Sequence, residues 1–230
     1  MIVDGASGAA RERFPPLEPS LLESAAMAKL SAAARARKIK LIIFDVDGVL
    51  TDGKIWIFPT PGGSHPGTQP SVLEKSAQAG PSNTGLIEAK GFHAHDGAGI
   101  SIARLAGIKT GIITKRESET VALRMRDLKM DHVYQGIQDK ASIFAEILEK
   151  DGISAAEAAF VGDDVIDLPV MRRCGLAMAV KNARPEVKAV AHWVTPHAGG
   201  DGAGRDAIEY VLKAQGRWKN AIEAYVSQKG

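Results

Sequence analysis

From residue 39 onward, short apolar runs alternate with longer stretches whose composition and spacing suit helices. The apolar runs cover residues 41–44, 108–113, 132–134, 158–161, 176–180 and 193–194. The stretches between them cover residues 97–106, 117–129, 139–151, 165–173 and 184–190. Strands and helices in alternation favour a parallel sheet that helices cover on both faces. The pattern therefore predicts a doubly wound α/β fold.

Residues 58–85 interrupt this alternation, because prolines and glycines recur through the segment. A structureless loop of this length is uncommon inside a compact domain and is usually functional or disordered. Residues 54–57 before the segment and 86–90 after it can pair as the two arms of a hairpin. We therefore expect a small β-hairpin that carries a Pro- and Gly-rich insertion.

The first 38 residues differ from the rest of the chain. Residues 1–19 hold several glycines and prolines with little periodicity, which indicates a disordered leader. Ser20 followed by Glu23 has the spacing of a capping box, and the Ala-rich stretch up to Arg37 then favours a helix. We expect this helix to be an appendage, either solvated and without function or able to bind a partner. The sequence thus divides into residues 1–38, partly disordered, and a domain at residues 39–230.

The composition of the chain limits its classes of partner. The net charge of +2 over 230 residues gives no reason for nucleic acid or anionic lipid to bind. No stretch approaches the roughly 18 apolar residues of a membrane helix. Cys174 is the only cysteine, which excludes a disulfide within the chain and a thiolate-rich metal cluster. These features predict a cytoplasmic protein that binds neither nucleic acid nor membrane.

Polar side chains follow the apolar runs, and in sheets of this kind ligands bind beyond the carboxyl ends of the strands. Asp45 and Asp47 come directly after the first run, and their i, i+2 spacing lets both carboxylates face one site. Gly48 then permits a tight turn whose backbone amides can approach an anion closely. The sequence therefore predicts an anion site at the end of the first strand.

Cationic residues follow the second and third runs. Thr114, Lys115 and Arg116 come just before a predicted helix, whose N-terminal amides attract phosphate. Lys140 opens the next predicted helix. Both groups would lie at the same edge of the sheet as the first.

Asp163, Asp164 and Asp167 follow the fourth run, and such a dense acidic cluster favours a bound cation. Each group alone has a structural explanation, because Thr114 or these acids can cap helices and Lys140 can be a surface lysine. Together they supply carboxylates, a hydroxyl and an ammonium at the ends of successive strands. These are the parts that phosphoryl transfer requires.

Four segments resemble the signature motifs of the haloacid dehalogenase superfamily, in the same order. They are DVDGVLTDG at residues 45–53, IIT at 112–114, Lys140 within QGIQDK, and GDDVID at 162–167. Longer segments resemble the capless subfamily that contains 3-deoxy-D-manno-octulosonate 8-phosphate phosphatase, namely HDGAGI at 95–100, YQGIQDK at 134–140, GDDVIDLPVM at 162–171 and GGDGAGRDAIE at 199–209. The likeness covers residues 39–225 except the 58–85 insertion. It implies a Rossmann-like domain with a hairpin flap and no large cap domain.

The resemblance also implies a phosphatase mechanism. Asp45 would attack phosphorus and form an aspartyl phosphate, while Asp47 would serve first as general acid and then as general base. The phosphate-binding groups would be Thr114, Lys115, Lys140 and the backbone amides around Gly48.

Mg²⁺ is the cofactor that the resemblance implies. Its protein ligands would be the carboxylates of Asp45 and Asp163 and the backbone carbonyl of Asp47, with water and a phosphate oxygen completing an octahedron. Asp164 and Asp167 would orient the groups around the metal.

This chain departs from the family pattern at three places that bear on substrate choice. His95 stands where relatives usually carry arginine, which offers a carboxylate two N–H donors instead of one. Lys115 stands where glycine is common, and the insertion at 58–85 interrupts the flap. Arg116 and Arg205 are further candidates for contacts with the substrate.

The first hypothesis is a phosphatase for an eight- or nine-carbon sugar acid phosphate in lipopolysaccharide or related surface-sugar synthesis. The resemblance implies a homotetramer in which a neighbouring subunit helps to cover the site. A second hypothesis changes the substrate to another small phosphate ester. A third is a non-catalytic binding protein, but such a protein has no need for the complete catalytic set. A dinucleotide-binding protein is excluded, because no Gly-x-Gly-x-x-Gly follows the first run.

Overall fold

Six strands form one parallel sheet in the computed structural model, which describes residues 30–59 and 86–227. The strand order is β5-β4-β1-β6-β7-β8. The strands are β1 (Leu41–Phe44), β4 (Lys109–Ile113), β5 (His132–Tyr134), β6 (Ala158–Gly162), β7 (Leu176–Ala179) and β8 (Trp193–Val194). All four residues of β1 are buried, as expected for a strand that helices cover on both faces. The prediction of an α/β fold with a parallel sheet is confirmed.

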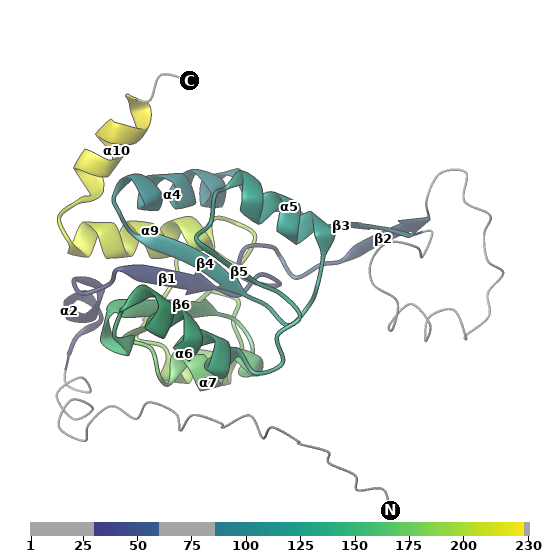
Figure 1. Ribbon diagram of the computed structural model, residues 1–230, viewed down its shortest axis with the longest axis horizontal. Helices are drawn as coiled ribbons and strands as arrows, with labels where there is room; N and C mark the ends of the chain where they lie inside the picture. The colour runs from purple at the N-terminus through teal and green to yellow at the C-terminus, as the bar shows by residue number, and fades with distance from the viewer. Residues whose placement is uncertain (1–29, 60–85, 228–230) are drawn as a thin grey trace, which may run out of the picture.

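Helices lie on both faces of this sheet, with α4, α5 and α9 on one side and α6 and α7 on the other (Figure 1). No described helix has the length and apolar character that crossing a membrane demands. The α-helices that follow the flap are α4 (Ala94–Leu105), α5 (Glu119–Asp127), α6 (Lys140–Asp151), α7 (Leu168–Met171), α8 (Pro185–Val190), α9 (Ala203–Ala214) and α10 (Trp218–Val226). Two 3-10 helices, η1 (Ala155–Glu157) and η2 (Val165–Asp167), flank β6.

The chain changes direction across the sheet at β1. After β1 it builds β4 and β5 on one side, and it then crosses to build β6, β7 and β8 on the other. Phe44 at the end of β1 pairs with Ile112 of β4 and with Val161 of β6. The loops after β1 and β6 therefore meet at the switch point, where open α/β sheets bind ligands.

A two-stranded antiparallel hairpin forms the flap, as predicted. Its strands are β2 (Trp56–Pro59) and β3 (Leu86–Ala89), and Ile57 pairs with Glu88. The hairpin projects away from the sheet (Figure 1). The expected start of the insertion at residue 58 is wrong, because Phe58 and Pro59 belong to β2 and pair with β3. The rest of the expected insertion, residues 60–85, lies outside the described residues.

The short helix α2 (Ala32–Ala36) packs into the core instead of extending from it as an appendage. Ser31 caps the helix, and the side chain of Ala36 is fully buried. The amide of Gln215 donates hydrogen bonds to the carbonyls of Ala36 (3.1 Å) and Ile39 (2.7 Å). The expected helix start at Ser20 lies outside the described residues, so the domain boundary at residue 38 stays a prediction.

Candidate active site

The first part of the candidate site is the loop that leaves β1. The backbone N–H of Asp45 donates to the carbonyl of Val161 at 3.0 Å, which continues the β1–β6 pairing one residue beyond the strand. One carboxylate oxygen of Asp45, Oδ1, accepts the N–H of Val46 at 2.7 Å. Gly48 follows with φ +94°, and a Cβ at this position would collide with the carboxylate of Asp163. Only glycine therefore lets the loop close so tightly over the end of β6.

Lys140 is the first residue of α6, and it contacts acids of both the loop after β1 and the loop after β6. Its Nζ lies 3.0 Å from Asp45 Oδ1 and 2.8 Å from Asp167 Oδ1, and its side chain is buried. The other oxygen of Asp167, Oδ2, accepts the backbone N–H of Asp163 at 3.0 Å. Protein donors thus occupy both oxygens of Asp167, which suits it to orient Lys140 and the Asp163 loop.

The charges in this cluster do not balance. Burial, followed by the charge of Asp167, raises the pKa of Asp45 to about 6. Burial and then the charge of Asp45 raise the pKa of Asp163 to about 7. Burial by itself would lower the pKa of Lys140, but Asp45 and Asp167 outweigh burial and raise it. Three carboxylates around one ammonium leave an excess of negative charge that a divalent cation would neutralise.

The donor atoms present fit a metal ion. Oxygens of Asp45, Asp163 and Asp167 lie within 4.8 Å of one another. Oδ1 of Asp163 is buried and has no hydrogen-bond partner among the described residues. A buried carboxylate oxygen without a donor is costly unless a cation binds it. Carboxylate ligands without histidine or cysteine favour a hard ion such as Mg²⁺.

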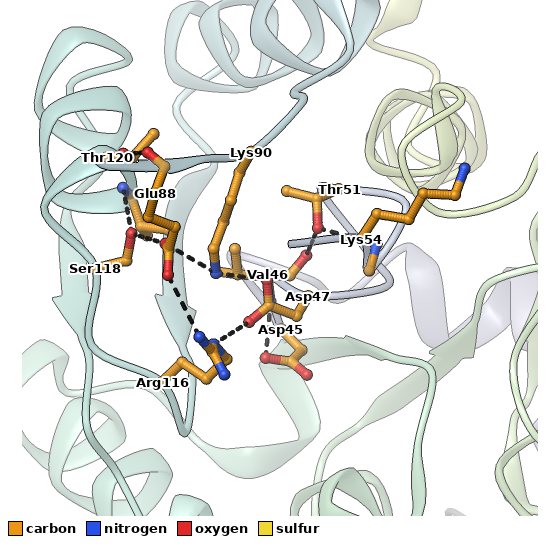
Figure 2. A network of polar contacts seen from close by, with 12 residues as sticks. Asp45, Val46, Asp47, Thr51, Lys54, Glu88, Lys90, Arg116, Ser118 and Thr120 are labelled. Atoms are coloured by element: carbon orange, nitrogen blue, oxygen red, sulfur yellow. Dashed lines mark hydrogen bonds and ion pairs between the residues drawn. The ribbon is translucent and has the colours of Figure 1, made fainter. Parts of the chain in front are cut away.

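Asp47 lies next to Asp45, and its carboxylate faces Lys90 and Arg116 (Figure 2). Its Oδ1 lies 2.6 Å from Lys90 Nζ, and its Oδ2 lies 3.6 Å from Arg116 Nε. Glu88 of β3 lies 3.3 Å from Arg116 Nη2. The flap therefore places a carboxylate and an ammonium beside the second acid of the site.

The segment after β4 carries two kinds of side chain. Thr114 is buried at the end of β4, and its backbone N–H donates to Tyr134 at 3.0 Å. Lys115 and Arg116 are exposed, and of these Arg116 reaches Asp47. Ser118, and not Thr114, caps the following helix, so the hydroxyl of Thr114 is not used as a cap.

The remaining acidic and basic candidates contact other groups. Asp164 is exposed, and its Oδ1 accepts the N–H of Val165 at 2.7 Å, as a cap of η2 does. His95 and Arg205 line an open cavity of about 380 Å³ that Asp45 and Asp47 do not line. The guanidinium of Arg205 stacks on the ring of Trp218, at 4.7 Å from its centroid. The other lining residues are His93, His197, Asp201, Gly202, Asp206 and Glu209.

Sequence reasoning missed Glu88, Lys90 and Ser118 as parts of the site. Glu88 and Lys90 fall in the hairpin arm at 86–90, which was expected only to carry the insertion. Their spacing of two places both side chains on one face of a strand, and this was the signal that could have shown them.

A buried cluster of carboxylates around one lysine, at the switch point of a doubly wound sheet, defines the class of metal-assisted hydrolases that act on phosphate esters. The chain belongs to the haloacid dehalogenase-like hydrolases and is a phosphoric monoester hydrolase. The model of this family matches residues 106–205.

Proteins similar to this chain share most of its length. The 3-deoxy-D-manno-octulosonate 8-phosphate phosphatase KdsC of Escherichia coli strain K12 is 38% identical over 188 residues, which are 82% of this chain and 87% of the relative. The structure of the phosphatase of that name from Yersinia pestis matches with a TM-score of 0.68 and 34% identity, over 82% of this chain and 88% of that one. The Moraxella catarrhalis phosphatase, solved with a magnesium ion, a phosphate ion and a KDO molecule, matches with a TM-score of 0.69 and 31% identity, over 84% and 97% of the two chains.

Proposed function

We propose that this protein is a Mg²⁺-dependent phosphatase that hydrolyses a sugar acid phosphate, such as 3-deoxy-D-manno-octulosonate 8-phosphate, through an aspartyl phosphate on Asp45. The observation that carries this proposal is the placement of Asp45 between Lys140 and Asp163 at the switch point of the sheet. The relative named as a phosphatase of this sugar phosphate aligns with 82% of the chain at 38% identity, which supports the substrate class.

In the first step a carboxylate oxygen of Asp45 attacks phosphorus. An Asp45–phosphorus bond forms while the bond from phosphorus to the sugar oxygen breaks, and Asp47 gives its proton to that oxygen. Lys140 stays 3.0 Å from Asp45 and neutralises charge near the transferring group. The products of this step are the free sugar alcohol and the aspartyl phosphate.

In the second step water replaces Asp45 on phosphorus. Asp47, now a carboxylate, takes a proton from the water molecule as its oxygen attacks. The bond between Asp45 and phosphorus breaks, which releases phosphate and restores the Asp45 carboxylate and the Asp47 acid. The buried Thr114 and the amides around Gly48 would hold the phosphate oxygens through both steps.

Mg²⁺ would be held by the carboxylates of Asp45 and Asp163 and by the backbone carbonyl of Asp47. When bound, the ion offsets the negative charge of the phosphate and of the Asp45 carboxylate. Asp167 keeps Lys140 in place through the 2.8 Å contact described above.

A panel of phosphate esters tests this function. Phosphate release is measured with Mg²⁺ on 3-deoxy-D-manno-octulosonate 8-phosphate, a nonulosonate 9-phosphate, neutral sugar phosphates and nucleotides. We expect the highest kcat/KM on a sugar acid phosphate, and no turnover in EDTA. A nonulosonate phosphate as the best substrate would support the alternative substrate, whereas no release from any ester would favour a non-catalytic binding protein.

We further propose a homotetramer in which the flap contacts a neighbouring subunit. Trp56, Ile57, Phe58 and Ile87 of the hairpin are 45–61% exposed, which is unusual for neighbouring large apolar side chains. Ile57→Ser should therefore lower the mass found by sedimentation and reduce activity with it. A fully active wild-type monomer at assay concentration would contradict the tetramer. The cytoplasmic location stays a prediction from the sequence.

A further inference from the structure

The flap strand β3 and the residue after it bring two charged side chains to Asp47, as Figure 2 shows. Glu88 and Lys90 are two residues apart, so an extended chain presents them on the same face. The side chain of Lys90 is fully buried, at 0% exposure, and its Nζ lies 2.6 Å from Asp47 Oδ1. Buried lysines are rare unless a carboxylate pairs with them.

Glu88 connects this strand to the start of α5. Its Oε1 accepts a hydrogen bond from the hydroxyl of Ser118, the N-cap of α5, at 2.6 Å. Its backbone carbonyl accepts a second one from the hydroxyl of Thr120 at 3.2 Å. The side chain of Glu88 is therefore fixed by α5, while its charge faces the site.

Four charges of alternating sign form a closed ring at this place (Figure 2). Lys90 lies 2.6 Å from Asp47 and 3.8 Å from Glu88. Arg116 lies 3.6 Å from Asp47 and 3.3 Å from Glu88. Each cation is thus shared between the two carboxylates, and without the charge of Glu88 both cations would pair with Asp47 alone.

We propose that Glu88 is a positioning residue for proton transfer by Asp47. This inference rests on the proposed function, in which Asp47 gives its proton to the leaving sugar oxygen. Asp47 has to hold its carboxyl group toward the leaving oxygen, and the two cations that contact this carboxyl group decide where it lies. By sharing Lys90 and Arg116, Glu88 holds both cations at fixed distances from Asp47 and so keeps its carboxyl group in place for proton transfer.

Leaving groups of different acidity test the inference. p-Nitrophenolate leaves phosphorus without a proton, whereas a sugar alkoxide has to receive a proton as it leaves. The variant is Glu88→Gln, which keeps the size of the side chain and an acceptor for Ser118. We expect kcat/KM on the sugar phosphate to fall about tenfold or more, which is part of the roughly 100- to 10,000-fold that general acid catalysis contributes. On p-nitrophenyl phosphate we expect kcat/KM to change less than about twofold. The constant kcat/KM is used because it reports the step that breaks the ester bond.

Thr120→Val is the matched control. It removes the hydrogen bond to the backbone carbonyl of Glu88, so it weakens the docking of β3 on α5 and leaves the carboxylate in place. If Glu88 only anchors the flap, both variants should lower both activities by similar factors, and that result would overturn the inference. If Glu88→Gln does not fold, Glu88→Asp is the second variant. It keeps the charge, but its shorter side chain moves the carboxylate away from Lys90 and Arg116, so the same selective loss is expected.

Failure of this inference can be separated from failure of the proposed function. Asp45→Asn should be inactive on both esters whatever Glu88 does. An active Asp45→Asn would refute the proposed function. An inactive Asp45→Asn together with equal losses in Glu88→Gln would refute the positioning role alone.

Discussion

The carboxylate of Asp96, in the first turn of α4, accepts the backbone N–H of Arg205, in the first turn of α9, at 2.8 Å. Gly202, the residue at the N-cap of α9, has no side chain to cap the helix, so Asp96 caps it from another helix. A Cβ on Gly204 would lie 3.1 Å from Asp96 Oδ1, which explains the glycine at this position. Two of the family-like segments, at 95–100 and 199–209, meet at this contact.

Stability should depend on pH through Asp96. Burial raises the pKa of Asp96 to about 6, above 3.8 for an ordinary aspartate. The folded state therefore binds the proton more tightly, and stability is lost as pH rises from about 4 to about 6. A difference of about two pKa units between the folded and unfolded states changes the free energy of unfolding by about 3 kcal/mol at most.

Asp96→Asn isolates this effect, because asparagine keeps the acceptor for Arg205 and cannot ionise. Urea unfolding of both proteins in EDTA between pH 4 and 7 measures it. The free energy of unfolding of wild type, relative to that of the variant, should fall by up to about 3 kcal/mol across this range. Parallel curves for the two proteins would contradict the prediction.

The sequence predicted the strands well and parts of the helices less well. The bounds of β1, β5 and β8 agree with the apolar runs, because strands buried on both faces read as continuous apolar segments. α4 begins at Ala94, before the expected residue 97, because His93 is its N-cap and its Nδ1 accepts the N–H of His95. Histidine is not a common cap, so the pattern gave no signal there.

The helix α9 was not among the predicted helices, although Ile208, Val211 and Leu212 form a buried apolar face. The segment before it is glycine-rich, and its one residue of a favoured cap type, Asp201, does not cap the helix. Asp96 supplies the cap from 109 residues away. The spacing of Glu88 and Lys90 was a local signal, but their pairing with Asp47 and Arg116 was missed for the same reason as the cap. Contacts between residues far apart in sequence leave no local pattern.

Asp45→Asn should abolish turnover and leave the fold intact. The carboxamide keeps the shape of the side chain but is not a nucleophile, so kcat should fall by at least about 1,000-fold. Phosphate release measures the loss, and thermal unfolding measures the fold. The melting temperature should stay the same or rise, because the variant removes one charge from a buried group of like charges. More than a tenth of wild-type activity would contradict the mechanism.

Asp163→Ala should weaken binding of Mg²⁺ by more than about tenfold, because it removes a ligand that has no other partner. Wild-type protein should gain thermal stability as Mg²⁺ is added, and the variant should gain little. In EDTA the variant should melt no lower than wild type, since the Asp163 carboxylate is a buried charge near Asp45.

Asp164→Ala is the control for this prediction. Asp164 is adjacent in sequence and acidic, but it is exposed and caps η2. The Asp164→Ala variant should keep the Mg²⁺-dependent rise in melting temperature. Equal loss of that rise in both variants would show that Asp163 is not a specific ligand.

Shortening residues 60–84 to a tight turn should leave the melting temperature nearly unchanged. Pro59 and Leu86 are paired at the two ends of the hairpin, so the chain can be closed there without moving the strands. Loop-closure entropy changes slowly with length, which keeps the cost small. We expect a change in KM or in substrate choice, measured on the ester panel. Unchanged kinetics on every ester would show that the insertion has no part in catalysis.

His95→Arg should improve kcat/KM on sugar acid phosphates by about tenfold, as expected for one added charge-assisted hydrogen bond. His95 is exposed on the first turn of α4, its ring 4.7 Å from that of His93, and it lines the cavity that Arg205 also lines. Arginine would reach further into this cavity and offer two parallel N–H donors to a carboxylate. Neutral sugar phosphates have no carboxylate and should gain little. His95→Lys adds the charge without the paired donors, so it should give a smaller gain, and equal gains on acidic and neutral esters would show that this position does not bind the carboxylate.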